Sequence, residues 1–269
     1  MKRDDLPLAG IPLAADPDAP RFTVERIESI ERRAPALLYF TVSRPAGYRF
    51  TPGHYARLGL GLGDDLVWRP YSIASAADDG PLAFQLTCAP GGKFTGLFCG
   101  AKQGDAIHVD RRSFGFHTVS SLAPGGTLFM LATGTGLAPY ISILADPLTW
   151  TRHERAVLVH SVRHAAELAP DAVAAAMQRH GPAVRARLTV LPVVTRETVP
   201  GTFGERLGAL LESGALEKAA GCAIEPAGAR VMLCGNPEMI LEMRKAMRDR
   251  GLAPGRRGVP GQLSAEGYW

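Results

Sequence analysis

Residues 127–139 read Thr127-Leu128-Phe129-Met130-Leu131-Ala132-Thr133-Gly134-Thr135-Gly136-Leu137-Ala138-Pro139. The run from Thr127 to Ala132 is dominated by apolar residues, as expected for a strand that is buried on both faces of a parallel sheet. A glycine-rich turn follows at once, and the apolar periodicity of residues 140–144 predicts a helix after it. A buried strand, a tight turn and a helix in this order are typical of a doubly wound α/β domain.

The remainder of the second half continues the alternation of strands and helices. Strands are predicted at residues 156–160, 188–194 and 230–234, and helices at residues 165–180, 205–213 and 237–250. Gly251 is a suitable residue to end the last helix. We therefore predict a parallel sheet in a domain that spans residues 125–269.

The first half has a different pattern, with short strands separated by Gly, Pro and Asp. Strands are predicted at residues 22–27, 36–42, 54–59, 66–74, 82–88 and 106–109, and a short helix at residues 95–98. Many short strands with turns at this spacing favour an antiparallel β-barrel. The predicted barrel domain covers residues 21–124, and residues 1–20 are predicted to be a mobile leader.

Composition excludes several classes of protein. The chain has 269 residues, of which 46% are hydrophobic and 21% charged, as in an ordinary globular protein. No apolar run approaches the ~18–20 residues of a membrane span. A formal net charge of +4 is too small for a typical nucleic-acid binder. The leader lacks the apolar core of a signal peptide, which predicts a cytoplasmic protein.

Cysteine spacing argues against a metal centre. The four cysteines form no CxxC pair or tight cluster, so neither zinc nor an iron–sulfur cluster is expected, and the thiols are expected to be reduced. Arginines are concentrated between Arg152 and Arg196. They form either a solvated face or a site for an anionic ligand or acidic partner, and charge alone favours the solvated face.

A second informative stretch is Arg69-Pro70-Tyr71-Ser72. It presents a cation, a flat aromatic ring and a hydroxyl within one predicted strand. The arginine can pair with a diphosphate, the tyrosine can stack on a ring system, and the serine can hydrogen-bond a ring nitrogen. These are the groups needed to hold a flavin.

Glycine-rich turns supply candidate phosphate sites. Gly134, Thr135 and Gly136 open a helix, whose N-terminal amides favour an anion, although a plain strand–helix turn explains the same residues. Cys234-Gly235-Asn236-Pro237 is either a capped helix start or a place for a second ring system. The pair Gly91-Gly92 before Thr95 either cradles a phosphate or forms an ordinary helix cap.

Charged and aromatic residues complete the set of candidates. Arg163, Arg196 and Arg206 each follow a predicted strand or begin a helix, and arginine suits phosphate because its planar fork binds two oxygens. Each alone is more simply a surface residue. The final pair, Tyr268-Trp269, covers either a hydrophobic patch or a cofactor ring.

Together these motifs resemble the bacterial ferredoxin (flavodoxin)–NADP reductase family of the plant-type superfamily, in the subclass that ends in Tyr-Trp. The resemblance covers residues 22–269. It implies an FAD-binding barrel followed by an NADP-binding α/β domain whose C-terminal tail returns to the flavin. Arg69 and Pro70 would lie at the FAD, with Arg69 on its diphosphate, while Tyr71 would stack on the isoalloxazine.

The same resemblance implies roles for the other candidates. Ser72 would lie near the flavin N5, and Lys93, Phe94 and Thr95 would hold the FAD phosphates. Gly134, Thr135 and Gly136 correspond to the pyrophosphate loop of NADP, and Cys234, Gly235 and Asn236 to the family's Cys-Gly-Asn-Pro motif. The remaining matches are Arg163 in His-x-x-Arg, Arg196 in Arg-Glu, and Arg206, all three at the adenylate end of NADP, and Trp269 on the FAD adenine.

The implied activity is electron exchange between NADP(H) and a ferredoxin or flavodoxin. Tyr71, Ser72 and Cys234 are the candidate catalytic residues, with Glu266 as the carboxylate that eases proton movement. The partners would be acidic carriers, and the protein a monomer. Two alternatives stay open: a reductase component that serves an oxygenase, and a non-catalytic flavin-binding sensor or assembly subunit.

Overall fold

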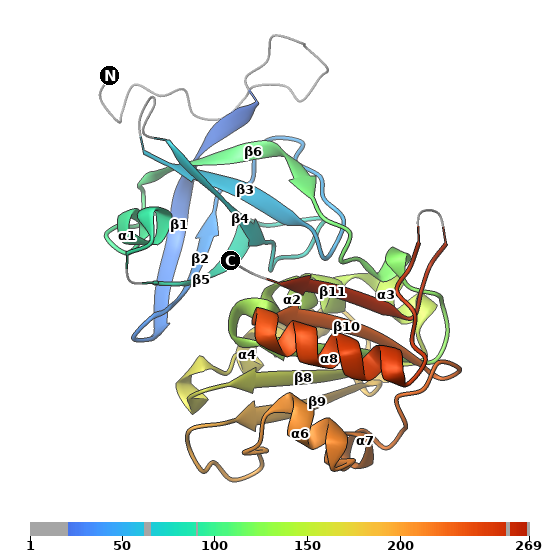
Figure 1. The fold of residues 1–269 in the computed structure, drawn as a ribbon. Helices are drawn as coiled ribbons and strands as arrows, with labels where there is room; N and C mark the ends of the chain where they lie inside the picture. The colour runs from blue at the N-terminus through green and yellow to red at the C-terminus, as the bar shows by residue number, and fades with distance from the viewer. Residues whose placement is uncertain (1–20, 62–65, 90, 257–258, 268–269) are drawn as a thin grey trace. The chain divides into compact units, whose positions relative to one another are not determined.

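The computed structural model describes residues 21–61, 66–89, 91–256 and 259–267 (Figure 1). The predicted leader and the terminal Tyr268-Trp269 lie outside these residues. The chain divides into two compact units, Met1–Gly115 and Phe116–Trp269. Residues 116–124, predicted to belong to the first domain, lie in the second unit. The Ala123 N–H donates to Gly261 O (2.7 Å) there, and Arg230 Nε donates to Ala123 O (2.9 Å).

The first unit is an antiparallel sheet in the strand order β4-β3-β6-β1-β2-β5. The sheet curls so that its two edge strands, β4 and β5, approach each other. The N–H of Ala74, just after β4, donates a hydrogen bond to Ala83 O of β5 (2.8 Å). This confirms the predicted antiparallel barrel. The elements are β1 (Phe22–Ala34), β2 (Leu37–Val42), β3 (Tyr55–Leu60), β4 (Val67–Ser72), β5 (Leu82–Thr87), α1 (Lys93–Phe98) and β6 (Ala106–Phe114).

Inside the barrel, alternate residues of the strands form one apolar core. Leu82, Phe84 and Leu86 of β5 are buried in it, together with Phe40 of β2. Phe94 and Phe98 of α1 pack into the same cluster, with the Phe40 and Phe98 ring centroids 4.2 Å apart. The short helix is therefore anchored by two aromatic side chains one turn apart.

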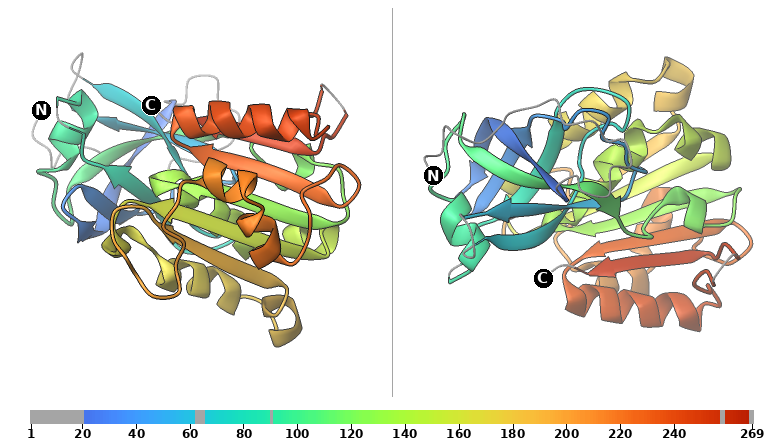
Figure 2. Two further views of the ribbon diagram at one scale, coloured as in Figure 1. Left: turned by 60° about the horizontal axis from the view of Figure 1, so that its bottom comes forward. Right: turned by 90° about the horizontal axis from the view of Figure 1, so that it is seen from above.

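The second unit is a five-stranded parallel sheet in the order β11-β10-β7-β8-β9. Helices lie on both faces of this sheet (Figure 2), which confirms the predicted doubly wound fold. The strands are β7 (Thr127–Thr133), β8 (Arg155–Val162), β9 (Leu188–Val194), β10 (Ala229–Gly235) and β11 (Leu263–Gly267). The helices are α2 (Ala138–Ala145), α3 (Pro147–Arg152), α4 (Pro170–Gln178), α5 (Pro182–Arg185), α6 (Leu207–Glu212), α7 (Ala215–Ala220) and α8 (Pro237–Asp249).

Successive side chains along the parallel strands point to opposite faces of the sheet and therefore pack against different helices. Phe129 and Leu131 of β7 belong to the core formed with α6, α7 and α8. Leu128 and Met130 are equally buried and point to the other face, where α2 and α4 pack together. Burial on both faces explains why the apolar run in β7 is continuous and not alternating.

Some elements differ from the prediction. Strand β11 and helices α3, α5 and α7 were not predicted. The single helix expected over residues 165–180 is a 3-10 turn at Ala165–Glu167 followed by α4, which begins at Pro170. Proline lacks an N–H and suits the first turn of a helix, so Pro170 starts a new helix where a continuous one was expected.

Cys88 and Cys99 form a disulfide, so the expectation of four reduced thiols is wrong for this pair. Cys88 follows β5 and Cys99 is the C-cap of α1, and the fold brings their Cα atoms to 6.5 Å. Cys222 is half-buried and free, and Cys234 is buried and free. The disulfide therefore closes the segment that contains the Gly91-Gly92 turn and α1.

We expect Cys99→Ser to lower the free energy of unfolding by about 3 kcal/mol, because a cross-link over a short loop restricts the unfolded chain. Urea unfolding of the oxidised protein measures this effect. Cys222→Ser is the matched control, since Cys222 lies outside the disulfide. Titration of the unfolded, unreduced wild type should find two thiols, and four thiols would contradict the pairing.

Within the described ranges, no helix is both long and apolar enough to cross a membrane. The same residues contain no group of three or more His, Cys, Asp or Glu side chains that could hold a metal ion.

Candidate functional site

Strand β4 places the residues of the Arg-Pro-Tyr-Ser motif on two faces. Arg69 and Tyr71 are two residues apart and share one face, and Ser72 lies on the other and is buried. Tyr71 packs against Phe94 of α1, with ring centroids 5.2 Å apart. Burial raises the pKa of Tyr71, so its hydroxyl stays protonated at neutral pH. The structure thus brings together two residues predicted to bind FAD: Tyr71, expected at the flavin ring, and Phe94, expected at the phosphates.

The start of α1 is a tight turn. Thr95 Oγ1 donates to Ala89 O (3.1 Å) and lies 3.3 Å from Gly92 O. A Cβ atom on Gly92 would lie only 2.2 Å from Thr95 Oγ1, so a larger residue at this position would displace the Thr95 hydroxyl. The Phe94 side chain is buried, whereas Lys93 is exposed. At this turn Lys93 can reach a phosphate with its side chain, and Phe94 only with its backbone N–H.

In the second unit, β7 and β10 are neighbours at the point where the strand order reverses. The chain leaves β7 in one direction, toward β8 and β9, and returns to form β10 and β11 on the other side. Ligands of doubly wound sheets bind at such a switch point, beyond the carboxyl ends of the strands. Both glycine turns singled out in the sequence lie at these two strand ends.

The two glycine turns pack directly against each other. A Cβ atom on Gly136 would lie 2.2 Å from Cys234 O, and one on Gly235 would lie 2.6 Å from Thr133 O. The Asn236 N–H donates to Thr133 Oγ1 (2.8 Å). The absence of side chains on Gly136 and Gly235 is thus required by their contact. Gly134 and Thr135 form the start of the 3-10 turn Gly134–Leu137, which leads directly into α2.

Asn236 begins α8. Its side-chain Oδ1 accepts hydrogen bonds from the N–H groups of Glu238 (2.8 Å) and Met239 (3.3 Å). This is an N-cap, in agreement with the simpler of the two interpretations of the Cys-Gly-Asn-Pro motif. A capping role does not prevent the exposed N-terminal end of α8 from facing a ligand.

Cys234 and Glu266 are register partners on adjacent strands β10 and β11. Cys234 is fully buried, and Glu266 is half-buried. Burial raises the pKa of Tyr140 on α2, and the nearby Cys234 and Glu266 raise it further. The sequence offered no reason to pair Cys234 with Glu266, because β11 was not predicted.

Three arginines lie beyond the carboxyl ends of β8 and β9. Arg163 follows β8, Arg196 follows β9, and Arg206 is the N-cap of α6. All three are exposed, and their guanidinium groups have no hydrogen bond or ion pair with any described residue. The backbones of Arg163 and Arg196 are hydrogen-bonded to each other, because the Arg196 N–H donates to Arg163 O (3.0 Å). The loops that follow adjacent strands therefore bring the backbones of Arg163 and Arg196 together.

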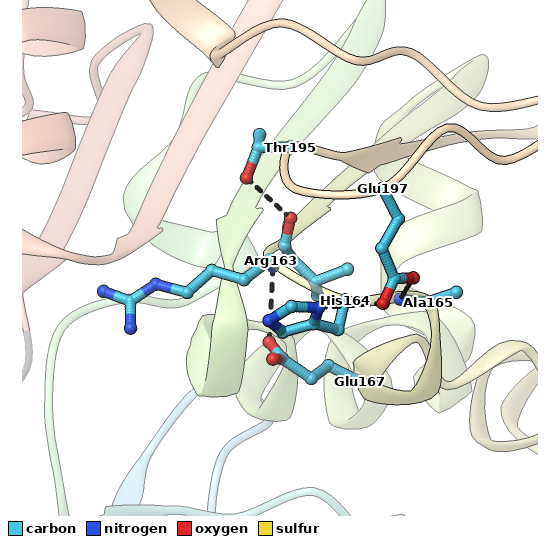
Figure 3. Close-up of polar contacts among 7 residues, drawn as sticks. Arg163, His164, Ala165, Glu167, Thr195 and Glu197 are labelled. Atoms are coloured by element: carbon cyan, nitrogen blue, oxygen red, sulfur yellow. Dashed lines mark hydrogen bonds and ion pairs between the residues drawn. The ribbon is translucent and has the colours of Figure 1, made fainter.

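Sequence reasoning assigned no role to several residues that shape these loops. His160 Nε2 donates to Gly134 O (3.0 Å), and burial lowers the pKa of His160 to about 4, so the ring is neutral. His164 Nδ1 forms a hydrogen bond with Glu197 Oε1 (2.8 Å; Figure 3). His160 belongs to the His-x-x-Arg motif and Glu197 to the Arg-Glu motif. These motifs are the sequence signal that could have identified the two residues. Trp269, the remaining predicted contact, lies outside the described residues.

Comparison with known proteins agrees with this arrangement. Residues 130–245 match the family model described as "Oxidoreductase NAD-binding domain". The chain is 36% identical to ferredoxin–NADP reductase A of Sorangium cellulosum, over 92% of this chain and 90% of that one. It is 34% identical to the flavodoxin/ferredoxin–NADP reductase of Escherichia coli, over 91% and 97%.

A solved structure gives a similar result. The ferredoxin NADP+ reductase of Neisseria gonorrhoeae, crystallised with bound FAD and NADP, superposes with a TM-score of 0.86 at 34% identity. The match covers 93% of this chain and all of that one.

Proposed function

The chain belongs to the ferredoxin–NADP reductase family, and on this basis we propose that it is an FAD-dependent oxidoreductase that exchanges electrons between NADP(H) and a ferredoxin or flavodoxin. The observation that carries the proposal is the contact of Gly136 with Cys234 at the switch point of the sheet. It supports a nucleotide site, because only turns without side chains let a diphosphate approach this backbone.

The first unit fits an FAD. Arg69 is exposed, and its guanidinium donates a hydrogen bond to Trp68 O (2.8 Å). A diphosphate can replace this carbonyl as the acceptor. The Gly92 turn offers the amides of Lys93, Phe94 and Thr95 to a phosphate. Tyr71 provides a flat ring for stacking, Pro70 holds the strand extended, and Ser72 supplies a hydroxyl for N5. Bound FAD supplies the chemistry, namely exchange of a hydride on one side and of single electrons on the other.

The second unit fits NADP(H). Gly134, Thr135, Gly136 and Gly235 receive the diphosphate, with Asn236 at the adjacent helix start, and Arg163, Arg196 and Arg206 bind the 2′-phosphate. Cys234 lines the nicotinamide end, and the Glu266 carboxylate beside it holds a proton near the reacting rings. We assign Trp269 to the FAD adenine, and the tail after β11 to the return toward the flavin.

The carrier, location and oligomeric state are further parts of the proposal. Ferredoxins and flavodoxins are acidic, and a protein with a formal charge of +4 attracts them in a salt-dependent manner. We infer that the protein acts as a monomer in the cytoplasm, where NADP(H) is available. Thiol trapping during cell lysis would show whether Cys88 and Cys99 are paired there.

Anaerobic reduction tests the function. The purified protein should show a flavin absorption spectrum that bleaches on mixing with NADPH, and it should then reduce ferredoxins or flavodoxins from a panel. A flavin that stays oxidised would favour a sensor or assembly subunit. Bleaching without transfer to any carrier in the panel would favour a reductase component of an oxygenase.

A further inference from the structure

Glu197 bridges two neighbouring loops at the carboxyl edge of the parallel sheet. It follows β9, and its carboxylate accepts hydrogen bonds from the loop after β8: from His164 Nδ1 to Oε1 (2.8 Å) and from the Ala165 N–H to Oε2 (2.9 Å). Both carboxylate oxygens are thus occupied (Figure 3). These hydrogen bonds lower the pKa of Glu197, that from Ala165 most, so the group is an anion at neutral pH.

Further contacts hold Arg163 from its other side. The Arg163 N–H donates to Glu167 Oε2 (3.3 Å), and Thr195 Oγ1 donates to Val162 O (3.1 Å). The Thr195 and Arg196 N–H groups donate to Val162 O and Arg163 O, both at 3.0 Å. The backbone of Arg163 is therefore held on both sides. Its guanidinium extends away from the His164–Glu197 pair (Figure 3).

The distribution of charge is informative. Glu167 and Glu197 lie in the same loops as the exposed Arg163 and Arg196, yet neither forms an ion pair with one of these arginines in the described residues. Their oxygens accept backbone N–H groups and the imidazole of His164. The carboxylates thus leave the arginine charges available to an anion. An unrestrained carboxylate at position 197 would instead be free to pair with an arginine or to repel a phosphate.

The pair has little to do with stability. The His164 and Glu197 side chains are 50% and 41% exposed. Solvent-exposed ion pairs contribute little to the free energy of folding. Their most direct consequence is therefore the position of the loop.

Resting on the proposed function, we propose that His164 and Glu197 are positioning residues for the 2′-phosphate of NADP(H): Glu197 holds the loop after β8 so that Arg163 and Arg196 present their guanidinium groups together. Neither residue needs to touch the nucleotide. The pair sets the preference for a 2′-phosphorylated nucleotide over its unphosphorylated counterpart. A planar guanidinium binds phosphate through two directed hydrogen bonds, so its affinity depends on placement.

Equilibrium binding tests this proposal without turnover. The probes are adenosine 2′,5′-bisphosphate and 5′-AMP, titrated into the FAD-loaded protein by calorimetry. Glu197→Gln and His164→Ala should each weaken binding of the bisphosphate roughly 5- to 30-fold, with the Kd of 5′-AMP unchanged. His164→Asn should restore most of the affinity, because its amide nitrogen can occupy the position of Nδ1. In steady-state kinetics, KM for NADPH should rise while kcat is maintained.

Asp249→Asn is the matched control, since it removes the carboxylate of another exposed side-chain pair, Lys245–Asp249, whose nitrogen and oxygen are 2.7 Å apart. It should leave both affinities unchanged. If Glu197→Gln binds both probes as the wild type does, the positioning role is wrong while the proposed function stands. Equal loss of both probes would also overturn it. A wild type that binds both probes equally would instead count against the NADP(H) site itself.

Discussion

The double substitution Arg163→Ala/Arg196→Ala is expected to lower the ratio of kcat/KM for NADPH to that for NADH by about 10²- to 10⁴-fold. Each guanidinium can form a charge-assisted contact with the 2′-phosphate, worth about 1.5–3 kcal/mol, and NADH lacks this phosphate. Neither guanidinium has a partner among the described residues, so removing them leaves no buried group unpaired.

Steady-state kinetics with both nucleotides measures this ratio. Arg185→Ala is the matched control: Arg185 is equally exposed but lies in α5, before β9, at the opposite edge of the sheet from the arginine loops. Its ratio should equal that of the wild type. An unchanged ratio in the double variant would show that the preference for NADPH, if present, comes from other residues.

Gly136→Ala is expected to reduce both stability and NADPH use. The new Cβ would lie 2.2 Å from Cys234 O and 2.9 Å from Gly235 Cα, and both are backbone atoms that cannot rotate away. The two turns must separate, at a cost of about 3 kcal/mol. Because the displaced backbone is the proposed diphosphate site, kcat/KM for NADPH should also fall about 100-fold.

Thermal unfolding and NADPH kinetics on the same preparation test this prediction. Gly181→Ala is the control, because a Cβ at Gly181 meets nothing within 4 Å and the residue has no positive φ. It should change neither quantity appreciably. A Gly136→Ala protein with wild-type melting temperature and kinetics would contradict the close contact of the two turns.

The sequence predicted the larger part of the fold because the relevant signals are local. The continuous apolar run of β7 and the glycine turn after it indicate a buried strand followed by a helix, whatever surrounds them. Strand β11 escaped prediction, since Leu263-Ser264-Ala265-Glu266-Gly267 has little apolar character of its own. It forms a strand because the edge of β10 supplies its hydrogen bonds.

By itself, the sequence determined the two kinds of domain, the order in which they occur, and the residues able to hold a flavin and a second nucleotide. Only the tertiary structure decided which of these residues are neighbours. The contact of Gly136 with Cys234, the register of Cys234 with Glu266, the bridge from Glu197 to His164 and the Cys88–Cys99 disulfide all depend on strand order or on chain closure. Periodicity and turn chemistry act over a few residues, whereas strand order is a property of the whole packed sheet.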